Sequence, residues 1–407
     1  MTVYSLLDTD LYKLTQSSAY FDLYPNAEGT FTFNDRNQEV YDEKFLEMLA
    51  MEFAKLCELR LTNEQYGYLL GIRFLKPNWV EWFKGFHFDL KKINFGLDGQ
   101  GHLHIDVTDK MYKVTLYEVP ILAIVAECRL KWLGAKIDFA KTLAKLSKKI
   151  DFANEHGIKF SEFGTRRRAS AALHLEICKL LKERCPINCV GTSNVHFAMM
   201  FDMMPSGTQA HEWVMFHQGV YGFKCANYRA IEAWIEHFGG DLGILLVDTT
   251  TTKSFLHTLT LKQAKLADGF RQDSGDEREI GNMIVDKLRE FRIDPMTKTI
   301  VFSNALDFEK AEQIQRYFNG IIKTAFGIGT NITCDIVLED GYDEVKFPDG
   351  KVKAANIVMK LSRCRFSPRD FWEPVIKISD DIGKHMGDPE LFEIAAKELH
   401  LKELGAI

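Results

Sequence analysis

The stretch Lys159-Phe160-Ser161-Glu162-Phe163 is a short, largely apolar run that passes directly into the polar sequence Gly164-Thr165-Arg166-Arg167-Arg168. A run of this length between two helical stretches is typical of a buried β-strand. Comparable runs recur, each separated from the last by a helical stretch, at residues 188–191, 243–248, 299–303, 321–326 and 355–360. Strands that alternate with helices pair in parallel. The sequence therefore predicts an α/β fold, which we expect to be an irregular TIM-like barrel over residues 121–360.

Polar and cationic residues follow the carboxyl ends of most of these runs. They are residues 163–168, Thr192 and Ser193, Asp248, Ser303 and Asn304, and residues 327–330. The carboxyl ends of barrel strands lie on one face of the barrel, and active sites assemble there. We therefore expect these residues to surround a single functional site.

Residues 1–120 follow a different pattern. Helical stretches at 42–59 and 62–70 alternate with extended pieces at 29–34 and 102–107, and no regular strand–helix repeat is visible. This pattern predicts a separate N-terminal α+β domain over residues 1–120, with which the C-terminal segment 361–407 is also able to pack.

Composition narrows the classes of partner. The chain has 407 residues and a formal net charge of -6, so cations that bind an anionic ligand must be gathered locally, and we expect no nucleic-acid partner. No signal sequence and no apolar run long enough to span a bilayer are present, so we expect no membrane association and a cytoplasmic location. The eight cysteines form no C-x-x-C pair and are expected to be reduced thiols.

Two short motifs suggest the binding of phosphates and a sugar, but each also has a structural interpretation. Gly327 and Gly329 allow backbone amides to approach a phosphate, and Thr330 adds a hydroxyl, although two glycines form a tight turn equally well. Arg271 offers a guanidinium for an anion, and Asp273 offers a carboxylate for ribose hydroxyls or Mg²⁺. In isolation, the acidic segment that begins at Asp273 is typical of a helix N-cap.

Three successive arginines, Arg166, Arg167 and Arg168, form either a solvated charge run or a ligand contact. Successive residues of a helix point about 100° apart, so all three cannot face one ligand. Their position after a strand favours an inward direction for at least one of them, and we select Arg166.

The segment Gly207-Thr208-Gln209-Ala210-His211 places a histidine in a small-residue turn. A neutral imidazole can attack phosphorus when its other nitrogen is held by a carboxylate, which gives an energy-rich P–N bond. The neighbouring Glu212 would point elsewhere on a helix. Asp248 is the better candidate to orient His211, although it could equally cap a helix that begins near Thr251.

The motifs, taken in this order, resemble the nicotinate phosphoribosyltransferase family. The resemblance is carried by Leu7-Asp-Thr-Asp-Leu-Tyr-Lys13, Tyr117-Glu-Val-Pro120, Glu162-Phe-Gly-Thr-Arg-Arg-Arg168, Gly207-Thr-Gln-Ala-His-Glu-Trp213, Arg271-Gln-Asp-Ser-Gly-Asp276, Val301-Phe-Ser-Asn-Ala-Leu-Asp307, Phe326-Gly-Ile-Gly-Thr330 and Asn356-Ile-Val-Met-Lys360. It implies that nicotinate and phosphoribosyl pyrophosphate give nicotinate mononucleotide and pyrophosphate in NAD biosynthesis. The same resemblance implies that this reaction is coupled to ATP hydrolysis and uses Mg²⁺.

The resemblance also implies roles for individual residues. His211 matches the histidine that ATP phosphorylates, and Asp248 matches its carboxylate partner. Phe163, together with Tyr12 from the other subunit of a homodimer, matches two aromatic rings that sandwich the pyridine. Arg166 and Arg271 match arginines near the base and the phosphates, Asp273 matches a ribose contact, and Gly327 and Gly329 match a phosphate loop.

Two positions bear on the choice of substrate. Related nicotinamide-using enzymes carry an Asp after Gly-Thr, whereas this chain has Gly191-Thr192-Ser193. An Asp would repel the carboxylate of nicotinate, so Ser193 favours the acid. Asn304 stands where many relatives are acidic, and its amide can bond ribose hydroxyls without adding a negative charge. The alternatives are a nicotinamide phosphoribosyltransferase and a catalytically inactive homologue that binds nucleotide as a regulatory partner.

Overall fold

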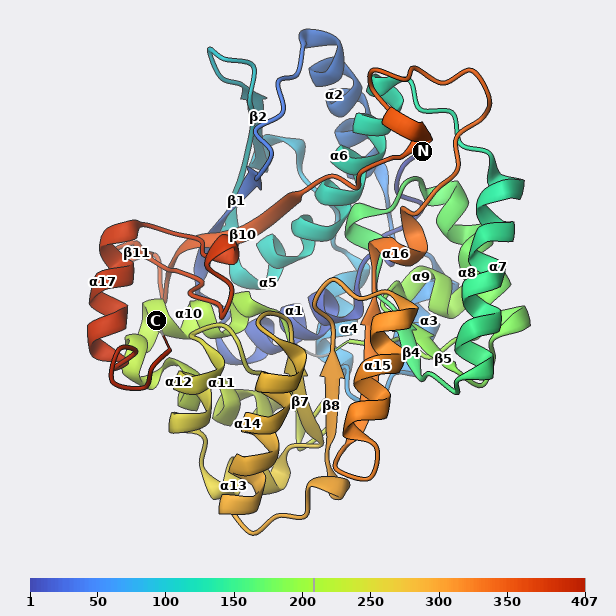
Figure 1. The fold of residues 1–407 in the computed structure, drawn as a ribbon. Coiled ribbons are helices and arrows are strands. Elements are labelled where there is room, and N and C mark those ends of the chain that lie inside the picture. Colours follow the sequence, from blue (N-terminus) through green and yellow to red (C-terminus); the bar gives the residue numbers. More distant parts are fainter. Residues whose placement is uncertain (208, 407) are drawn as a thin grey trace.

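Two β-sheets of different construction organise the chain in the computed structural model, which describes residues 1–207 and 209–406 (Figure 1). In this described part, the first sheet has six parallel strands in the order β5-β4-β9-β8-β7-β6. Its strands are β4 (Phe160–Glu162), β5 (Cys189–Thr192), β6 (Ile244–Leu246), β7 (Gly269–Gln272), β8 (Thr299–Phe302) and β9 (Lys323–Ile328). The expected α/β architecture with a parallel sheet is therefore confirmed. The sequence patterns did not indicate β7, whose four residues include two polar side chains.

The two ends of this sheet, β5 and β6, are not joined by a ladder in the described residues. The segment that leads to His211 lies between them. Thr192 of β5 donates its amide to the carbonyl of Met204 at 3.1 Å, and the amide of Leu246 in β6 lies 3.4 Å from Gln209 Oε1. Gly191 permits this approach, because a Cβ there would lie 2.1 Å from the carbonyl oxygen of Met204. Closure of the barrel stays a prediction, and Thr208 lies outside the described residues.

Apolar side chains from the strands and from amphipathic helices form the core around the parallel sheet. Phe270, Ile300 and Phe326 are buried on the strands, and helices with one apolar face cover them. In α14 (Glu277–Glu290), the buried residues Ile280, Ile284 and Leu288 recur every four positions, and Asp276 caps the helix by accepting from two backbone amides.

The second sheet is antiparallel and has the order β11-β10-β1-β3-β2. Its strands are β1 (Glu28–Asp35), β2 (Ile93–Leu97), β3 (Leu103–Lys110), β10 (Ile357–Arg365) and β11 (Glu373–Pro374). β1 and β10, at opposite ends of the chain, pair from Glu28 opposite Arg365 to Asp35 opposite Ile357. The strand expected at 355–360 therefore belongs to this sheet and not to the parallel one, so that assignment was wrong. A local apolar run does not reveal which distant strand it pairs with.

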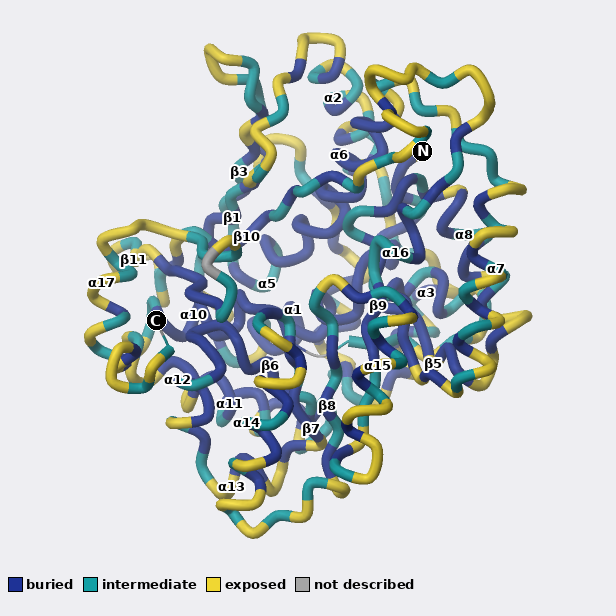
Figure 2. Tube along the Cα trace, viewed as in Figure 1, coloured by how far each residue is buried: buried dark blue, intermediate teal, exposed yellow. Residues whose placement is uncertain are grey.

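Helices surround both sheets. α6 (Glu118–Leu133) is buried on all sides over its first thirteen residues and packs against β10, while α2 (Glu43–Glu58) packs on α6. The remaining helices are α1 (Leu11–Leu23), α3 (Asn63–Leu70), α4 (Pro77–Lys84), α5 (Met111–Val114), α7 (Phe139–Glu155), α8 (Ala171–Arg184), α9 (Val195–Met200), α10 (His211–Tyr221), α11 (Phe223–Phe238), α12 (Thr252–Thr258), α13 (Leu261–Leu266), α15 (Phe308–Phe318), α16 (Thr330–Thr333) and α17 (Pro389–Glu398). Figure 2 shows that burial follows the central elements, whereas the rim loops are exposed. Among the described residues, no helix combines the length and the apolar character needed to cross a membrane.

Candidate active site

A cavity of about 580 Å³ is lined by residues from both sheets. Most of the site residues predicted from the sequence line it, namely Phe163, Arg166, His211, Arg271, Asp273, Ser303, Asn304, Gly327, Gly329 and Thr330. Tyr12, Thr192, Ser193 and Asp248 lie outside this lining. The loops that follow the parallel strands therefore converge on one site, as the strand-end pattern predicted.

The lining of the cavity is cationic, although the whole chain has a net charge of -6. Its cations are Arg36, Arg166, Arg167, Arg271, Lys360, Lys377 and Lys384. Its carboxylates are Asp273, Asp307 and Asp335. This local excess of positive charge suits an anionic ligand with several phosphates.

His211 is the first residue of α10 and lies at the wall of the cavity. Its Nδ1 lies 3.0 Å from Thr249 Oγ1, and its Nε2 lies 3.2 Å from Asp273 Oδ2 and 3.9 Å from Asp248 Oδ1. Burial, followed by the nearby charge of Lys377, lowers the pKa of His211 to about 4. The imidazole is therefore neutral at pH 7 and keeps the lone pair that a nucleophile needs.

Asp248 is more distant from His211 than the sequence suggested. It follows β6, is fully buried, and accepts a hydrogen bond of 2.6 Å from Ser274 Oγ. It does not cap α12, because Thr251 caps that helix. The nearer hydroxyl neighbour of His211 is Thr249, which sequence reasoning missed because a threonine beside a candidate aspartate carries no distinguishing pattern.

Asp273 is held by three neighbours at the cavity wall. Arg271 Nη2 lies 3.2 Å from Asp273 Oδ1, and Ser303 Oγ donates to the same oxygen at 2.8 Å. Burial would raise the pKa of Asp273, but Arg271 and His211 outweigh it and hold the pKa well below its usual value. The helix that follows is capped by Asp276, which leaves the ionised carboxylate of Asp273 facing the cavity.

The arginine triplet divides between the cavity and the core. Arg166 and Arg167 both line the cavity, whereas Arg168 is buried and pairs with both carboxylate oxygens of Asp8 at 2.7 and 2.8 Å. Arg167 was missed because the residues lie in a short 3-10 turn and not in a regular α-helix. The adjacent Phe163 ring packs over Gly327, where a Cβ would lie 2.4 Å from the ring.

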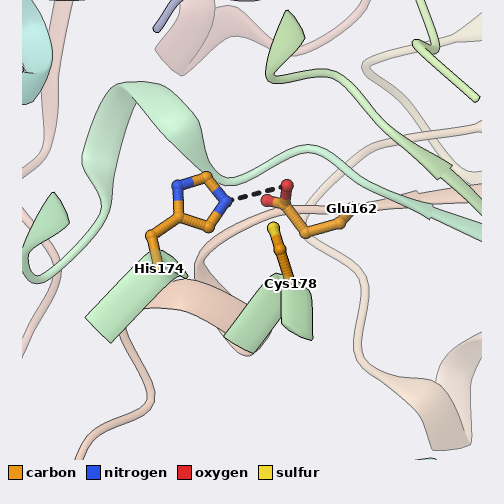
Figure 3. Close-up of side chains that lie close together, drawn as sticks. All are labelled: Glu162, His174 and Cys178. Carbon is orange, nitrogen blue, oxygen red and sulfur yellow. Dashed lines mark ion pairs between the residues drawn. The ribbon is translucent and has the colours of Figure 1, made fainter. Parts of the chain in front are cut away.

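Below the Phe163 turn lies a buried cluster of Glu162, His174 and Cys178 (Figure 3). His174 Nε2 lies 2.9 Å from Glu162 Oε2, and Thr192 Oγ1 donates to the same oxygen at 2.5 Å. The backbone amide of Gly164 donates to Glu162 Oε1. These side chains are of metal-binding types, but the glutamate already accepts hydrogen bonds from the protein. Thr192 therefore contacts Glu162 under the site and does not reach into the cavity.

Ser193 and Tyr12 lie together beside Arg166. Ser193 Oγ donates to Asp10 Oδ1 at 2.7 Å, and the other oxygen of Asp10 lies 3.7 Å from Arg166 Nε. The Tyr12 ring is buried against Val119, and its centroid lies 5.9 Å from Arg166 Cζ in the same chain. A carboxylate therefore does lie next to position 193, but Asp10 contributes it.

Besides Arg167, four cations of the lining were not anticipated from the sequence: Arg36, Lys360, Lys377 and Lys384. Burial lowers the pKa of Lys360 to about 8, although the carboxylate of Glu118, 3.5 Å away, opposes this effect. Arg36 directly follows β1, and Lys360 ends one of the motifs quoted above. Both positions therefore gave a weak indication in the sequence that these residues belong to the site. The two C-terminal lysines had none, because they are brought to the site by tertiary packing.

The family model described as the nicotinate phosphoribosyltransferase N-terminal domain matches residues 7–126, and the model of the nicotinate phosphoribosyltransferase family matches residues 158–403. The curated nicotinate phosphoribosyltransferase of Desulforapulum autotrophicum is 36% identical over 390 residues, which are 95% of this chain and 96% of that protein.

Solved structures agree with these sequence matches. A crystal structure of nicotinate phosphoribosyltransferase from Porphyromonas gingivalis has 39% identity and a TM-score of 0.93, covering 98% of this chain and 100% of the other. The crystal structure of the Vibrio cholerae nicotinate phosphoribosyltransferase has 32% identity and a TM-score of 0.90, with coverages of 99% and 96%. Both the sequence and the fold match over nearly the full length, and the chain belongs to the nicotinate phosphoribosyltransferase family of enzymes.

Proposed function

We propose that this protein transfers the phosphoribosyl group of phosphoribosyl pyrophosphate to nicotinate and couples the transfer to ATP hydrolysis through a phosphohistidine at His211. The product is nicotinate mononucleotide, a precursor in NAD biosynthesis. The observation that carries the proposal is a neutral histidine at the wall of a cationic cavity, with an aromatic ring in the same lining.

The surroundings of His211 favour one tautomer. Carboxylate oxygens of Asp273 and Asp248 both face Nε2 of His211 and would repel a lone pair on that nitrogen. The proton of the neutral imidazole therefore resides on Nε2. Nδ1 then carries the lone pair beside the hydroxyl of Thr249. In the proposed step, a bond forms between Nδ1 and the γ-phosphorus of ATP, the bond from that phosphorus to the bridging oxygen breaks, and ADP leaves with the electron pair.

Base transfer needs alignment and charge neutralisation more than proton transfer. The pyridine nitrogen carries its own lone pair and attacks ribose C1, while the bond from C1 to pyrophosphate breaks. Phe163 offers a face for stacking, with Tyr12 proposed as the second ring. Arg36, Arg167 and Arg271 are placed to neutralise the departing pyrophosphate.

The residues near His211 fit the Mg²⁺ that the family implies. Asp248 Oδ1 has no hydrogen-bond partner within residues 1–207 and 209–406, and Asp273 exposes a second carboxylate to the cavity. Mg²⁺ favours one or two carboxylates together with substrate phosphates, and when bound it would offset phosphate charge. Asp273 and Asp248 are the residues we propose to hold it.

We propose that phosphorylation of His211 links ATP use to substrate binding. The phosphoryl group on Nδ1 adds negative charge beside Thr249, and this charge rearranges the nearby loops and improves substrate binding. Hydrolysis of the phosphohistidine then removes that charge and drives product release.

Selection of the acid over the amide is proposed to depend on cations. Ser193 by itself gives the acid little advantage, because Asp10 places a carboxylate beside that residue. Arg166 and Lys360 line the cavity and both approach Glu118 Oε1, at 3.6 and 3.5 Å. A carboxylate on the base would be attracted by this pair, whereas a neutral carboxamide would gain less.

The test is phosphoribosyl transfer by the purified protein with Mg²⁺, phosphoribosyl pyrophosphate and either nicotinate or nicotinamide, each with and without ATP. We expect nicotinate mononucleotide to form faster with ATP, together with ADP. If product formed with nicotinamide but not with nicotinate, the protein would be a nicotinamide phosphoribosyltransferase. Tight mononucleotide binding without product from either base would identify a regulatory homologue.

A further inference from the structure

Glu118, the first residue of α6, is fully buried behind the wall of the cavity. Its Oε1 lies 3.6 Å from Arg166 Nη1 and 3.5 Å from Lys360 Nζ, and both cations line the cavity, whereas Glu118 does not. Arg166 comes from the 3-10 turn after β4, and Lys360 comes from β10. One carboxylate oxygen therefore faces two cavity cations that belong to different sheets.

The other oxygen of Glu118 is held from the protein interior by Lys13. Lys13 Nζ pairs with Glu118 Oε2 and also with Glu212 Oε2, and all three side chains are at most 1% exposed. Thr115 donates its hydroxyl to Glu212 Oε1. Lys13 therefore has a second carboxylate partner, which it would keep if Glu118 lost its charge.

The surroundings of Glu118 keep its side chain ionised. A carboxylate in the first turn of a helix is stabilised by the helix dipole. Burial would raise the pKa of Glu118, but the neighbouring charges of Lys13, Lys360 and Arg166 outweigh it and hold the pKa below its usual value. The negative charge of Glu118 is thus shared by one interior cation and two cavity cations.

Lys360 depends on this carboxylate for its own charge. Glu118 is the only carboxylate within 4.0 Å of Lys360 Nζ in residues 1–207 and 209–406. Burial and repulsion from Arg166, Lys13 and Lys377 lower the pKa of Lys360, and the attraction of Glu118 opposes them. Without the charge of Glu118, the same neighbours would favour the neutral amine.

We propose that Glu118 is a positioning residue that keeps Lys360 charged and directs Arg166 toward the carboxylate of the base, while Lys13 anchors it to Glu212. Glu118 acts through the two cations and does not touch the base. The inference deepens the proposed function and rests on it for the identity of the ligand, a planar base that carries a carboxylate. The charge of Lys360 can be tested without that ligand.

The first experiment measures the charge of Lys360 directly, in the full-length protein without substrates. Acetic anhydride acylates only the neutral amine, and mass spectrometry gives the extent of labelling at Lys360 as a function of pH. In the wild type, labelling should rise through about pH 8. Glu118→Gln should shift this midpoint about one pH unit lower, because it removes the carboxylate next to Lys360. Glu47→Gln, which removes an exposed glutamate from α2, should leave the midpoint unchanged.

The second experiment measures the affinity for nicotinate by calorimetry between pH 6 and 9. Affinity should decline as Lys360 loses its proton, and in Glu118→Gln this decline should begin about one pH unit lower than in the wild type. The double variant Glu118→Gln/Lys360→Arg should bind nicotinate about threefold more tightly at pH 8 than Glu118→Gln does, because a guanidinium stays charged without a carboxylate neighbour. A residue that only stabilised the fold would not move the pH profile or allow this rescue.

An unchanged labelling midpoint at Lys360 in Glu118→Gln would overturn the inference, and so would a shifted midpoint with an unmoved pH profile of nicotinate affinity. If Glu118→Gln does not fold, Glu118→Asp decides in its place, because it keeps the charge but withdraws it from Lys360 and should shift both profiles in the same direction by less. If the midpoint shifts but the wild-type protein forms no nicotinate mononucleotide, the proposed function fails, whereas the dependence of Lys360 on Glu118 stands.

Discussion

The two sheets contribute to the cavity in different ways. The parallel sheet supplies His211, Asp273 and Phe163 from loops that follow successive strands, so its part of the site repeats one local rule. The antiparallel sheet supplies Arg36 and Lys360 from two strands that meet from opposite ends of the chain. Reactive groups thus come from the first sheet, whereas the second adds cations and the apolar residues Ile357 and Val358. This difference predicts that substitutions in the loops of the first sheet lower the rate of the reaction, whereas substitutions in the second sheet weaken the binding of anions.

The largest expected effect is on the parallel side. His211→Ala should abolish ATP-derived phosphate on the protein and lower kcat/KM of the ATP-coupled reaction by at least about 100-fold, while slow uncoupled transfer persists. The measurement is protein-bound phosphate after incubation with labelled ATP, with ADP and mononucleotide followed in parallel. His104→Ala, on the exposed face of β3, is the matched control and should retain full phosphate incorporation. Stoichiometric phosphate on His211→Ala would place the acceptor elsewhere.

A smaller effect is expected on the antiparallel side. Arg36→Gln removes a half-buried guanidinium from the cavity wall and should weaken the binding of phosphoribosyl pyrophosphate about tenfold, with kcat changing less. The binding constant and the steady-state parameters are measured together. Arg60→Gln, an exposed arginine that follows α2, serves as the control. If Arg36→Gln bound phosphoribosyl pyrophosphate as tightly as the wild type, Arg36 of the second sheet would have no role in binding this anion.

Tyr12 tests whether one chain completes its own site. The family resemblance assigns the ring to the other subunit of a homodimer, yet within one chain it already lies beside Arg166. Tyr12→Ala is mixed with His211→Ala, which alone retains only slow uncoupled transfer, and subunit exchange is verified by mass spectrometry. If Tyr12 acts across the dimer, the mixture should regain activity up to about a quarter of that of the wild type. Mixed dimers without any recovery would show that the ring serves its own chain.

The smallest effect concerns pH. The pKa of Lys360 is lowered to about 8, so this lysine is charged below that pH and loses its charge above it. The affinity for nicotinate should therefore decline about threefold as the pH rises from 7 to 9. Lys360→Arg should remove this decline, because a guanidinium stays charged throughout that range. A decline that persists unchanged in Lys360→Arg would assign it to another group. Because the pKa of His211 is lowered to about 4, we expect no loss of activity from its protonation between pH 6 and 7.

The same contrast explains what could be predicted from the sequence. The strands at 159–163 and 299–303, and the polar residues after them, were recognised because apolar runs and strand-end polarity are local patterns. The sheet that contains β10 was assigned wrongly, because pairing between segments more than three hundred residues apart leaves no periodic signal. Asp273 was ambiguous until the structure showed Asp276 as the helix cap.

The pairing of β1 with β10 also determines when the antiparallel sheet can be completed during synthesis. Glu28 and Arg365 bond across 337 residues of sequence. At about 5 to 20 residues per second, the ribosome delivers the second partner roughly 20 to 70 s after the first. During that interval β1 can pair with β3, but its other edge stays open and awaits a strand. An open edge of this kind can pair with strands of other chains, so the nascent chain is exposed to aggregation until β10 emerges.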